Sequence, residues 1–196
     1  MINYNRLNSI RSKKLIRHAF LELLNENEYR KITVTAIVNR AEINRSTFYS
    51  HYPDIRGLME DIEIELSDEL KRIIGNYKTI DVINNPRPLI IAITDFFDIN
   101  KKMFKLLLTS EDSVRFFENT FDILNSIAIS RDDISYKTRT DISYIINVQY
   151  YVGGFISVYH DWVLGKIDCS KDLLVNDLTD IIIRASAYRK INKTAE

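Results

Sequence analysis

The side chains in this sequence whose types and spacing favour chemistry lie at residues 45–50, where they are suited to reading a nucleic acid. Arg45 and Tyr49 are four residues apart, so on a helix they share one face, with Ser46 and Ser50 beside them. An arginine in this setting can donate two hydrogen bonds to O6 and N7 of a guanine. A second set of nearby donors suits phosphate oxygens, which fix register without reading sequence: Thr33, Thr47, Tyr49 and His51.

The elements that must position these side chains are two short helices joined by a tight turn. The stretch 33–56 reads TVTAIVNRAEINRSTFYSHYPDIR. A helix that Thr33 caps, a turn, and a second helix that begins near Asn44 form the helix-turn-helix plan. Alanines in and after the first of these helices allow close approach, and Phe48 and Tyr52, four residues apart, can pack inward. The polar face described above then points outward.

Apolar residues recur at helical spacing along almost the whole chain, which predicts an all-α fold. Only 5 Gly and 3 Pro occur among the 196 residues, too few to punctuate a many-stranded sandwich or barrel. Pro86 and Pro88 mark a turn, and a polar stretch at 130–138 predicts a loop. Asp54 and Ser170 are candidate caps. We expect helices over residues 9–26, 33–40, 44–52, 54–77, 87–99, 101–109, 111–129, 139–164 and 171–190.

The segment from about residue 12 to 60 resembles the N-terminal domain of TetR-type transcriptional regulators. Three runs carry the resemblance: AFLELL in the first helix, ITVTAIVNRA in the second and INRSTFYSHY in the third. The resemblance implies two sets of DNA-contacting side chains. Those that face bases or nearby backbone are Arg45, Ser46, Tyr49 and Ser50. Those along the phosphates are Thr33, Thr35, Thr47 and His51, and Asn44 completes the expected set.

Two positions depart from the family pattern. The family usually has a glycine in the turn, where a left-handed backbone is convenient, whereas this sequence has Glu42. The family often has a lysine at the start of the fourth helix, whereas this sequence has Ile55 followed by Arg56. The sequence therefore does not predict the phosphate contact that the family's lysine makes at that position. Neither departure disturbs the apolar framework.

Charge is balanced over the whole chain but not along it. The first sixty residues hold ten Lys and Arg against six Asp and Glu, a net charge of +4, and the remaining 136 carry −4. A basic N-terminal part suggests a nucleic-acid module, although solvated helix faces can also differ this much by chance. We expect a DNA-binding domain over residues 8–68 and a helical regulatory and dimerisation domain over 69–196, joined by a long fourth helix.

The remaining chain resembles the family's variable helical domain in size and helix pattern, which implies an effector cavity and a dimer interface. The helices expected over 139–164 and 171–190 have broad apolar faces, and a pair from each subunit would form a four-helix bundle. Gly153 and Gly154 suit close packing at such a seam or a kink beside a cavity. The aromatic residues expected to contact an effector, or alternatively to be ordinary core, are Phe104, Phe117, Phe121, Tyr151 and Phe155.

These features predict a homodimeric, ligand-responsive regulator, a repressor that a small molecule releases from a palindromic DNA operator. The alternative is a TetR-like coactivator or adaptor that acts through a protein partner with little specific DNA binding. An enzyme is not expected, because the sequence has no metal-ligand spacing, phosphate-binding loop or nucleophile motif. We therefore expect no catalytic residue, no cofactor and no metal. His160 beside Asp161 is interpreted as a helix-surface or interface histidine.

The expected compartment is the cytoplasm. The single cysteine, Cys169, excludes an internal disulfide framework. The first twenty residues lack the apolar run of a signal peptide, and the nearest candidate for a membrane span, residues 144–163, is broken by polar side chains. No membrane partner is expected.

Overall fold

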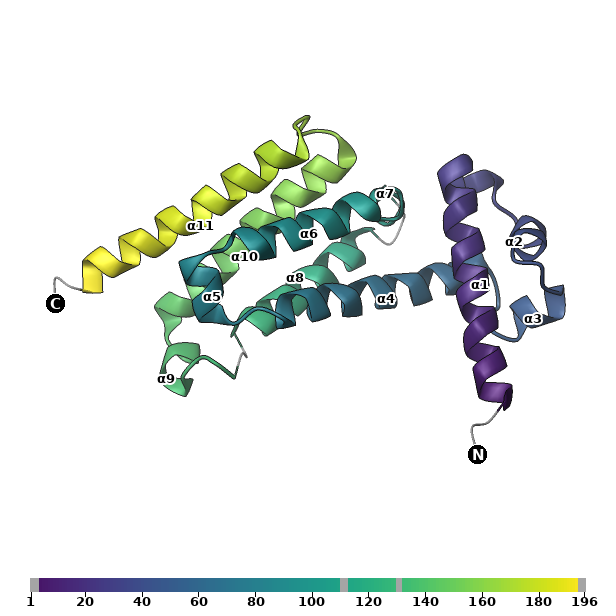
Figure 1. Ribbon diagram of the computed structural model, residues 1–196, viewed down its shortest axis with the longest axis horizontal. Coiled ribbons are helices and arrows are strands. Elements are labelled where there is room, and N and C mark those ends of the chain that lie inside the picture. Colours follow the sequence, from purple (N-terminus) through teal and green to yellow (C-terminus); the bar gives the residue numbers. More distant parts are fainter. Residues whose placement is uncertain (1–3, 110–112, 130–131, 194–196) are drawn as a thin grey trace. The chain divides into compact units, whose positions relative to one another are not determined.

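The computed structural model describes residues 4–109, 113–129 and 132–193, and within these ranges it contains helices and no strand (Figure 1). This all-α architecture confirms the fold class predicted from the sequence. The chain divides into two compact units, Met1–Leu66 and Ser67–Glu196. The boundary falls inside one helix, α4 (Ile55–Gly75), so each unit contains part of it. In these described ranges, no helix combines the length and apolar character that crossing a bilayer requires.

The core of the N-terminal unit is built on the first helix, α1 (Tyr4–Glu26). Apolar side chains three and four residues apart form its inner stripe, and the buried members are Ile16, Ala19, Phe20, Leu23 and Leu24. The helix-turn-helix consists of α2 (Val34–Arg40) and α3 (Arg45–Tyr49). α2 packs against both α1 and α3. Ile37 and Phe48 are fully buried, so each of the two short helices is anchored by one large apolar side chain.

Helix ends in this unit differ from the predicted ones in three places. α1 begins at Tyr4 rather than near residue 9. A 3₁₀ turn, η1 (Tyr29–Lys31), links α1 to α2 and was not predicted. α3 ends at Tyr49 rather than near residue 52, and the turn that follows it runs to Pro53. Proline disfavours helical backbone at the residue before it, so Tyr52 is a poor position for a helical residue.

The start of α4 is fixed by a side-chain cap and a close approach. The backbone N–H of Gly57 donates to Oδ1 of Asp54 at 2.8 Å, which confirms Asp54 as the cap. A Cβ atom added to Gly57 would lie only 2.9 Å from Cδ of Pro53, so a glycine lets the turn lie against the helix. The predicted helix 54–77 is thus observed as Ile55–Gly75.

The C-terminal unit continues from α4 through seven further helices in the described ranges. Two of them, α6 (Arg87–Ile99) and α7 (Lys101–Thr109), coincide with the predicted helices. α8 (Ser113–Ile129) matches the predicted helix 111–129, whose first two residues lie outside the described residues. The last helix, α11 (Lys171–Lys193), runs three residues beyond the predicted end. The others are α5 (Thr79–Asn84), α9 (Tyr136–Arg139) and α10 (Ile142–Leu164).

α5 and α9 were not predicted. Because α9 ends at Arg139, α10 begins later than the predicted helix 139–164. The hydroxyl of Ser135 accepts from the N–H of Thr138 at 3.2 Å, which caps α9 inside the expected loop 130–138. Two residues after α9 ends, Asp141 Oδ1 accepts from the N–H of Ser143 at 2.9 Å and caps α10. The predicted helix 139–164 therefore begins at Ile142, because two polar caps in succession separate the segments.

α10 lies at the centre of the packing in the C-terminal unit, where it contacts α6, α7, α8 and α9. α6 also contacts α7 and α11, and α8 packs against α7. Ile90, Met103 and Val163 are almost fully buried in this core. α10 ends before Gly165 as predicted, with Gly165 in the left-handed region at φ 76°. Ser170 caps α11 as predicted, since its Oγ accepts from the backbone N–H of the third following residue at 3.2 Å.

Candidate nucleic-acid interface

The turn between α2 and α3 is defined by hydrogen bonds at both of its ends. Oγ1 of Thr33 accepts from the N–H of Ala36 at 3.2 Å, so Thr33 caps α2 as predicted. After α2, the N–H of Ile43 donates to the carbonyl of Val38 at 3.0 Å. Glu42 lies between these points with φ 54°, in the left-handed region. The turn thus requires a left-handed backbone at Glu42, a conformation that a glycine adopts without steric penalty.

α3 presents a buried apolar face and an exposed polar face. Phe48 is fully buried, and Tyr52, just beyond the end of α3, is only 3% exposed. The opposite face is exposed and consists of Arg45, Ser46, Tyr49 and Ser50. A short helix that follows a tight turn and exposes hydroxyl and guanidinium groups has the geometry that major-groove reading requires.

Arg45 is oriented by a contact between the two helices of the motif. Its guanidinium donates to Oγ1 of Thr35 on α2, and both side chains are exposed. This contact uses one of the five guanidinium donors and leaves the others for a ligand. Asn44 occupies the N-cap position of α3 and is exposed, but its side chain makes no capping hydrogen bond. The hydroxyl of Ser50 donates to the carbonyl of Thr47 at 2.7 Å.

The structure places His51 against α1. Thr33 and Thr35 are exposed, whereas Thr47 and His51 are half-buried. Nε2 of His51 lies 2.7 Å from Oγ of Ser12 on α1. This contact brings α1 next to the end of α3, although the two residues are 39 positions apart in the sequence.

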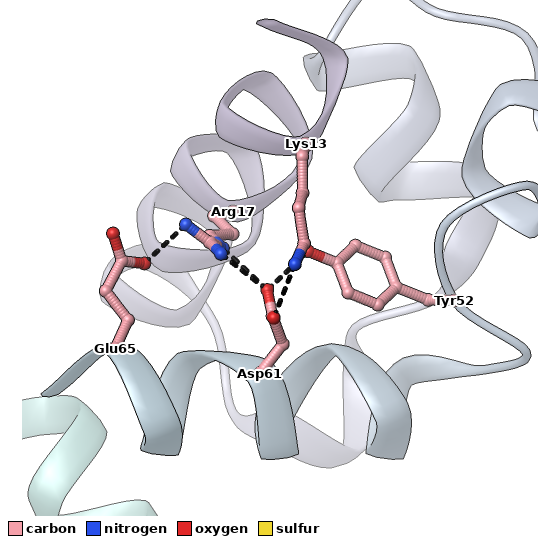
Figure 2. A network of polar contacts seen from close by, with 5 residues as sticks. All are labelled: Lys13, Arg17, Tyr52, Asp61 and Glu65. Carbon is pink, nitrogen blue, oxygen red and sulfur yellow. Dashed lines mark hydrogen bonds and ion pairs between the residues drawn. The ribbon is translucent and has the colours of Figure 1, made fainter. Parts of the chain in front are cut away.

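One carboxylate, Asp61 on α4, joins α1, the end of the helix-turn-helix and α4 (Figure 2). Lys13 and Arg17 of α1 donate to it at 2.6 and 2.8 Å. The hydroxyl of Tyr52 donates to Oδ2 of Asp61 at 2.7 Å. Arg17 also forms an ion pair with Glu65 at 2.6 Å, one turn further along α4. Figure 2 shows the three donors converging on Asp61 from α1 and from the segment after α3.

Two opposing effects set the pKa of Asp61. Burial alone raises it, whereas hydrogen bonds from Lys13, Tyr52 and Arg17 lower it, and the resulting pKa lies below the usual value for aspartate. Burial and the contact with the Asp61 carboxylate raise the pKa of the Tyr52 phenol. At neutral pH the carboxylate is therefore ionised and the phenol protonated, which is the combination that the hydrogen bonds require.

Ion pairs bind part of the positive charge of the N-terminal unit and leave part of it exposed. Cations bound to carboxylates of the same unit are Lys13, Arg17, Lys31, Arg40 and Arg56. Among the side chains of this unit that the structure describes, four exposed cations form no ion pair: Arg11, Lys14, Arg30 and Arg45. Arg11 and Lys14 lie one and two residues from Ser12 on α1, the helix that contacts the end of α3. Sequence reasoning missed these α1 residues, because only the contact between Ser12 and His51 reveals their position.

The C-terminal unit contains an apolar cavity of about 260 Å³, bordered by residues from α4 to α8, α10 and α11. Of the aromatic residues expected to contact an effector, Phe104 and Phe155 line this cavity. Phe121 and Tyr151 do not line it. The side chain of Phe117 lies outside the part of the structure that is described. Sequence reasoning missed the aliphatic part of the lining, among it Leu70, Val82 and Ile93.

α10 also carries an exposed apolar stripe, which consists of Ile142, Ile146 and Tyr150 at four-residue intervals. These side chains are 72%, 59% and 75% exposed. Gly154 continues the stripe after four more residues, and no atom lies within 4 Å of the place where its Cβ would be. Gly153 differs, since a Cβ there would meet the ring of Phe121 at 3.5 Å. An exposed stripe of this kind marks a surface for interaction.

Two family models match the chain. Residues 16–62 match the model described as bacterial regulatory proteins, tetR family, and residues 84–184 match the model described as transcriptional regulator C-terminal region. The second match alone covers just over half of the chain. A Bacillus subtilis (strain 168) protein named uncharacterized HTH-type transcriptional regulator YxbF is 23% identical over 109 residues. That alignment covers 54% of this chain and 29% of the relative, so the chain matches less than a third of that protein's length.

Solved structures of similar fold cover most of the chain. The dihydroxyacetone kinase operon activator DhaS is 16% identical with a TM-score of 0.64, and the match covers 90% of this chain and 97% of that one. The Thermus thermophilus TetR-family transcriptional repressor FadR, solved in complex with lauroyl-CoA, is 17% identical with a TM-score of 0.52. That match covers 87% of this chain and 93% of the other. At these identities the likeness concerns the fold.

Proposed function

The chain belongs to the TetR family of bacterial transcriptional regulators, and from this premise we propose that it binds a palindromic DNA operator as a homodimer. A small molecule bound in the C-terminal unit changes its affinity for that operator. The observation that carries the proposal is the exposed polar face of α3, with Arg45 held on it by Thr35 while Phe48 fills the core behind. A helix with this division of faces can lie in a major groove without disturbing its own domain.

The hydrogen-bond donors around α3 suit the two kinds of DNA contact. Arg45 is the donor for base edges, since it has a planar fork with several free N–H groups. Thr33 lies at the start of α2, before the recognition face in the chain. His51 follows α3 and contacts Ser12 of α1. Lys14, exposed on α1 two residues after Ser12, adds a cation for phosphates. We assign the phosphate contacts to these flanking groups.

A homodimer is supported by the exposed apolar stripe of α10. A soluble monomer rarely leaves a continuous row of large apolar side chains in water, and Gly154 allows a second helix to approach the row closely. α11 adds exposed Leu173, Ile181 and Ile183. A two-fold axis through this surface would present two copies of α3 to half-sites about 10 base pairs, or a multiple, apart.

The direction of regulation follows from the position of the operator relative to a promoter. DhaS is named an operon activator and FadR a repressor. We propose repression with release by a ligand. The cavity in the C-terminal unit supports the response to a ligand, because it offers a site at which a small molecule can favour one conformation over another.

The experiment that tests this function selects bound fragments from the source genome with the purified protein, at low and at near-physiological salt. The expected result is one palindromic sequence whose enrichment survives the higher salt, together with a dimer on the DNA. Binding that is non-specific and disappears with salt would overturn the proposal. A stable complex with another protein, without specific DNA binding, would instead favour the adaptor hypothesis.

A further inference from the structure

The lining of the C-terminal cavity constrains what can bind there. Within the part of the chain that the structure describes, no carboxylate, ammonium or guanidinium group lines it. Its volume of about 260 Å³ is far larger than ordinary packing voids, which rarely exceed one water molecule. It is also slightly below the ~300 Å³ at which pockets for drug-sized ligands begin. The space therefore suits a small molecule rather than a whole coenzyme.

The hydroxyl groups in the lining already donate hydrogen bonds to other groups of the protein. Thr120 and Tyr144 donate to main-chain carbonyls of α8 at 2.8 and 2.9 Å. Thr94, behind the lining, donates to a carbonyl one turn back on α6, so Tyr159 must donate to Thr94 at 2.8 Å. Thr79 donates to Asp133. These hydroxyl oxygens can therefore still accept a hydrogen bond from a ligand but cannot donate one.

One lining side chain, His160, carries ring nitrogens. Its Nδ1 lies 2.8 Å from Oδ1 of Asp161, and this hydrogen bond, followed by contacts from Lys166, lowers the pKa of Asp161. The imidazole is thus already in contact with a carboxylate of the protein. Apart from this ring, the described lining offers an anionic group no ammonium, no guanidinium and no hydroxyl donor.

From this lining we propose that the cavity takes an uncharged, mainly apolar molecule whose polar group, where it has one, donates a hydrogen bond, as an alcohol or phenol does. A carboxylate of the same size binds more weakly, because burial removes its hydration and the lining returns no hydroxyl donor and no ammonium or guanidinium group. This inference rests on the proposed function only in calling the molecule an effector. The binding itself is measured without DNA.

Trp162 provides an internal reporter for the site. It is the only tryptophan of the chain, and its ring packs edge-to-face on Tyr159 with centroids 6.5 Å apart. Tyr159 lines the cavity and stacks on Phe97 at 4.7 Å. Occupation of the cavity is therefore expected to change the emission of Trp162, and ligand binding to the folded state raises the unfolding temperature.

The test titrates the full chain with two matched pairs of probes: 1-octanol against octanoate, read by Trp162 emission, and 4-ethylphenol against 4-ethylbenzoate, read by the unfolding temperature. We expect each neutral probe to bind at least ~10-fold more tightly than its carboxylate. Equal or tighter binding of the carboxylates, or no binding by any probe, would overturn the proposal.

The location is tested by filling the cavity. Ala128 lines it, so Ala128→Leu is expected to weaken 1-octanol binding by ~10-fold or more. Ala92→Leu is the matched control, because Ala92 lies half-buried on α6 outside the lining. Unchanged octanol binding in a folded Ala128→Leu variant would refute the location. If the wild-type chain binds octanol but no operator, the proposed function is overturned, whereas the proposed ligand class is still supported.

Discussion

Asp61 differs from the other carboxylates of the N-terminal unit because three donors from two other segments converge on it. Its side chain is only 20% exposed, and its partners Lys13 and Arg17 belong to α1, whereas Tyr52 follows α3. Several other ion pairs of the described residues connect neighbouring turns of one exposed helix, where water and salt screen them. At the scale of single residues, Asp61 is therefore where a small chemical change has its largest effect on how the DNA-binding unit is held together.

We expect Asp61→Asn to lower the free energy of unfolding by about 2 kcal/mol at pH 7, because it removes the negative charge and one of the two oxygens to which Lys13, Arg17 and Tyr52 donate. Chemical denaturation measures this change. The matched control is Asp68→Asn on the same helix, where the carboxylate is 65% exposed and pairs only with Lys71, so a change below about 0.5 kcal/mol is expected. Equal effects of the two substitutions would contradict the role of the network.

The same contacts give the stability a defined dependence on pH. Folding lowers the pKa of Asp61, so its contribution is fully present above the unfolded value of about 3.9 and is lost as pH falls through the folded pKa. The difference in stability between the wild type and Asp61→Asn is therefore expected to be constant near neutral pH and to shrink in acid. A difference that grew toward low pH would be incompatible with a lowered pKa.

Arg45 and Lys14 are expected to act on DNA in different ways. Arg45→Ala is expected to relax base preference at one position of each half-site by about 1–3 kcal/mol, since a side chain that reads a base edge carries sequence information. Lys14→Ala is expected to weaken all sequences alike and to reduce the salt slope by about 1 for each subunit. Binding to single-base operator variants at several salt concentrations separates the two effects.

Arg72→Ala is the control for both substitutions, because Arg72 is an exposed cation of the C-terminal unit that pairs with Glu69. It is expected to change neither base preference nor salt slope. An unchanged base preference in Arg45→Ala would remove Arg45 from the reading role and leave it, like Lys14, as a positioning contact.

At the scale of secondary-structure elements, helices were predictable where the apolar pattern runs for several turns. α6 and α7 match their predicted bounds because each has a regular apolar face, whereas α5 and α9 are too short for such a pattern to develop. The recognition face of α3 was also predictable, since neighbours four residues apart define it. The contacts of Asp61 with Lys13 and Arg17 were not, because they join residues more than 40 positions apart.

The turn between α2 and α3 carries a strain that a substitution can remove. Glu42 adopts φ 54°, a conformation that costs most residues about 1–2 kcal/mol and glycine almost nothing. Glu42→Gly is therefore expected to raise the free energy of unfolding by about 1 kcal/mol, measured by chemical denaturation. Glu28→Gly is the control, since Glu28 has φ −68° and gains nothing from a glycine. A destabilised Glu42→Gly variant would mean that the glutamate side chain has a contact of its own.

At the scale of the whole molecule, one helix serves two surfaces. Phe155 and Tyr159 of α10 line the cavity, while Ile142, Ile146 and Tyr150 of the same helix form the exposed stripe. If the stripe is the dimer interface, a ligand in the cavity lies one helix away from it. Small shifts of α10 would then change the spacing of the two recognition helices, which is the quantity that operator binding depends on.

Dimerisation through the stripe is tested by placing a charge in its middle. Ile146→Glu is expected to raise the dimer dissociation constant by ~10-fold or more, because two like charges related by the two-fold axis would be buried against each other. Sedimentation equilibrium measures this constant. Ile99→Glu is the control, since Ile99 is 82% exposed at the end of α6 and does not belong to the stripe. We further expect Ile146→Glu to lose affinity for the palindrome far more than for a single half-site, because each α3 remains intact. A variant that stays dimeric, or that loses both sites equally, would place the interface elsewhere.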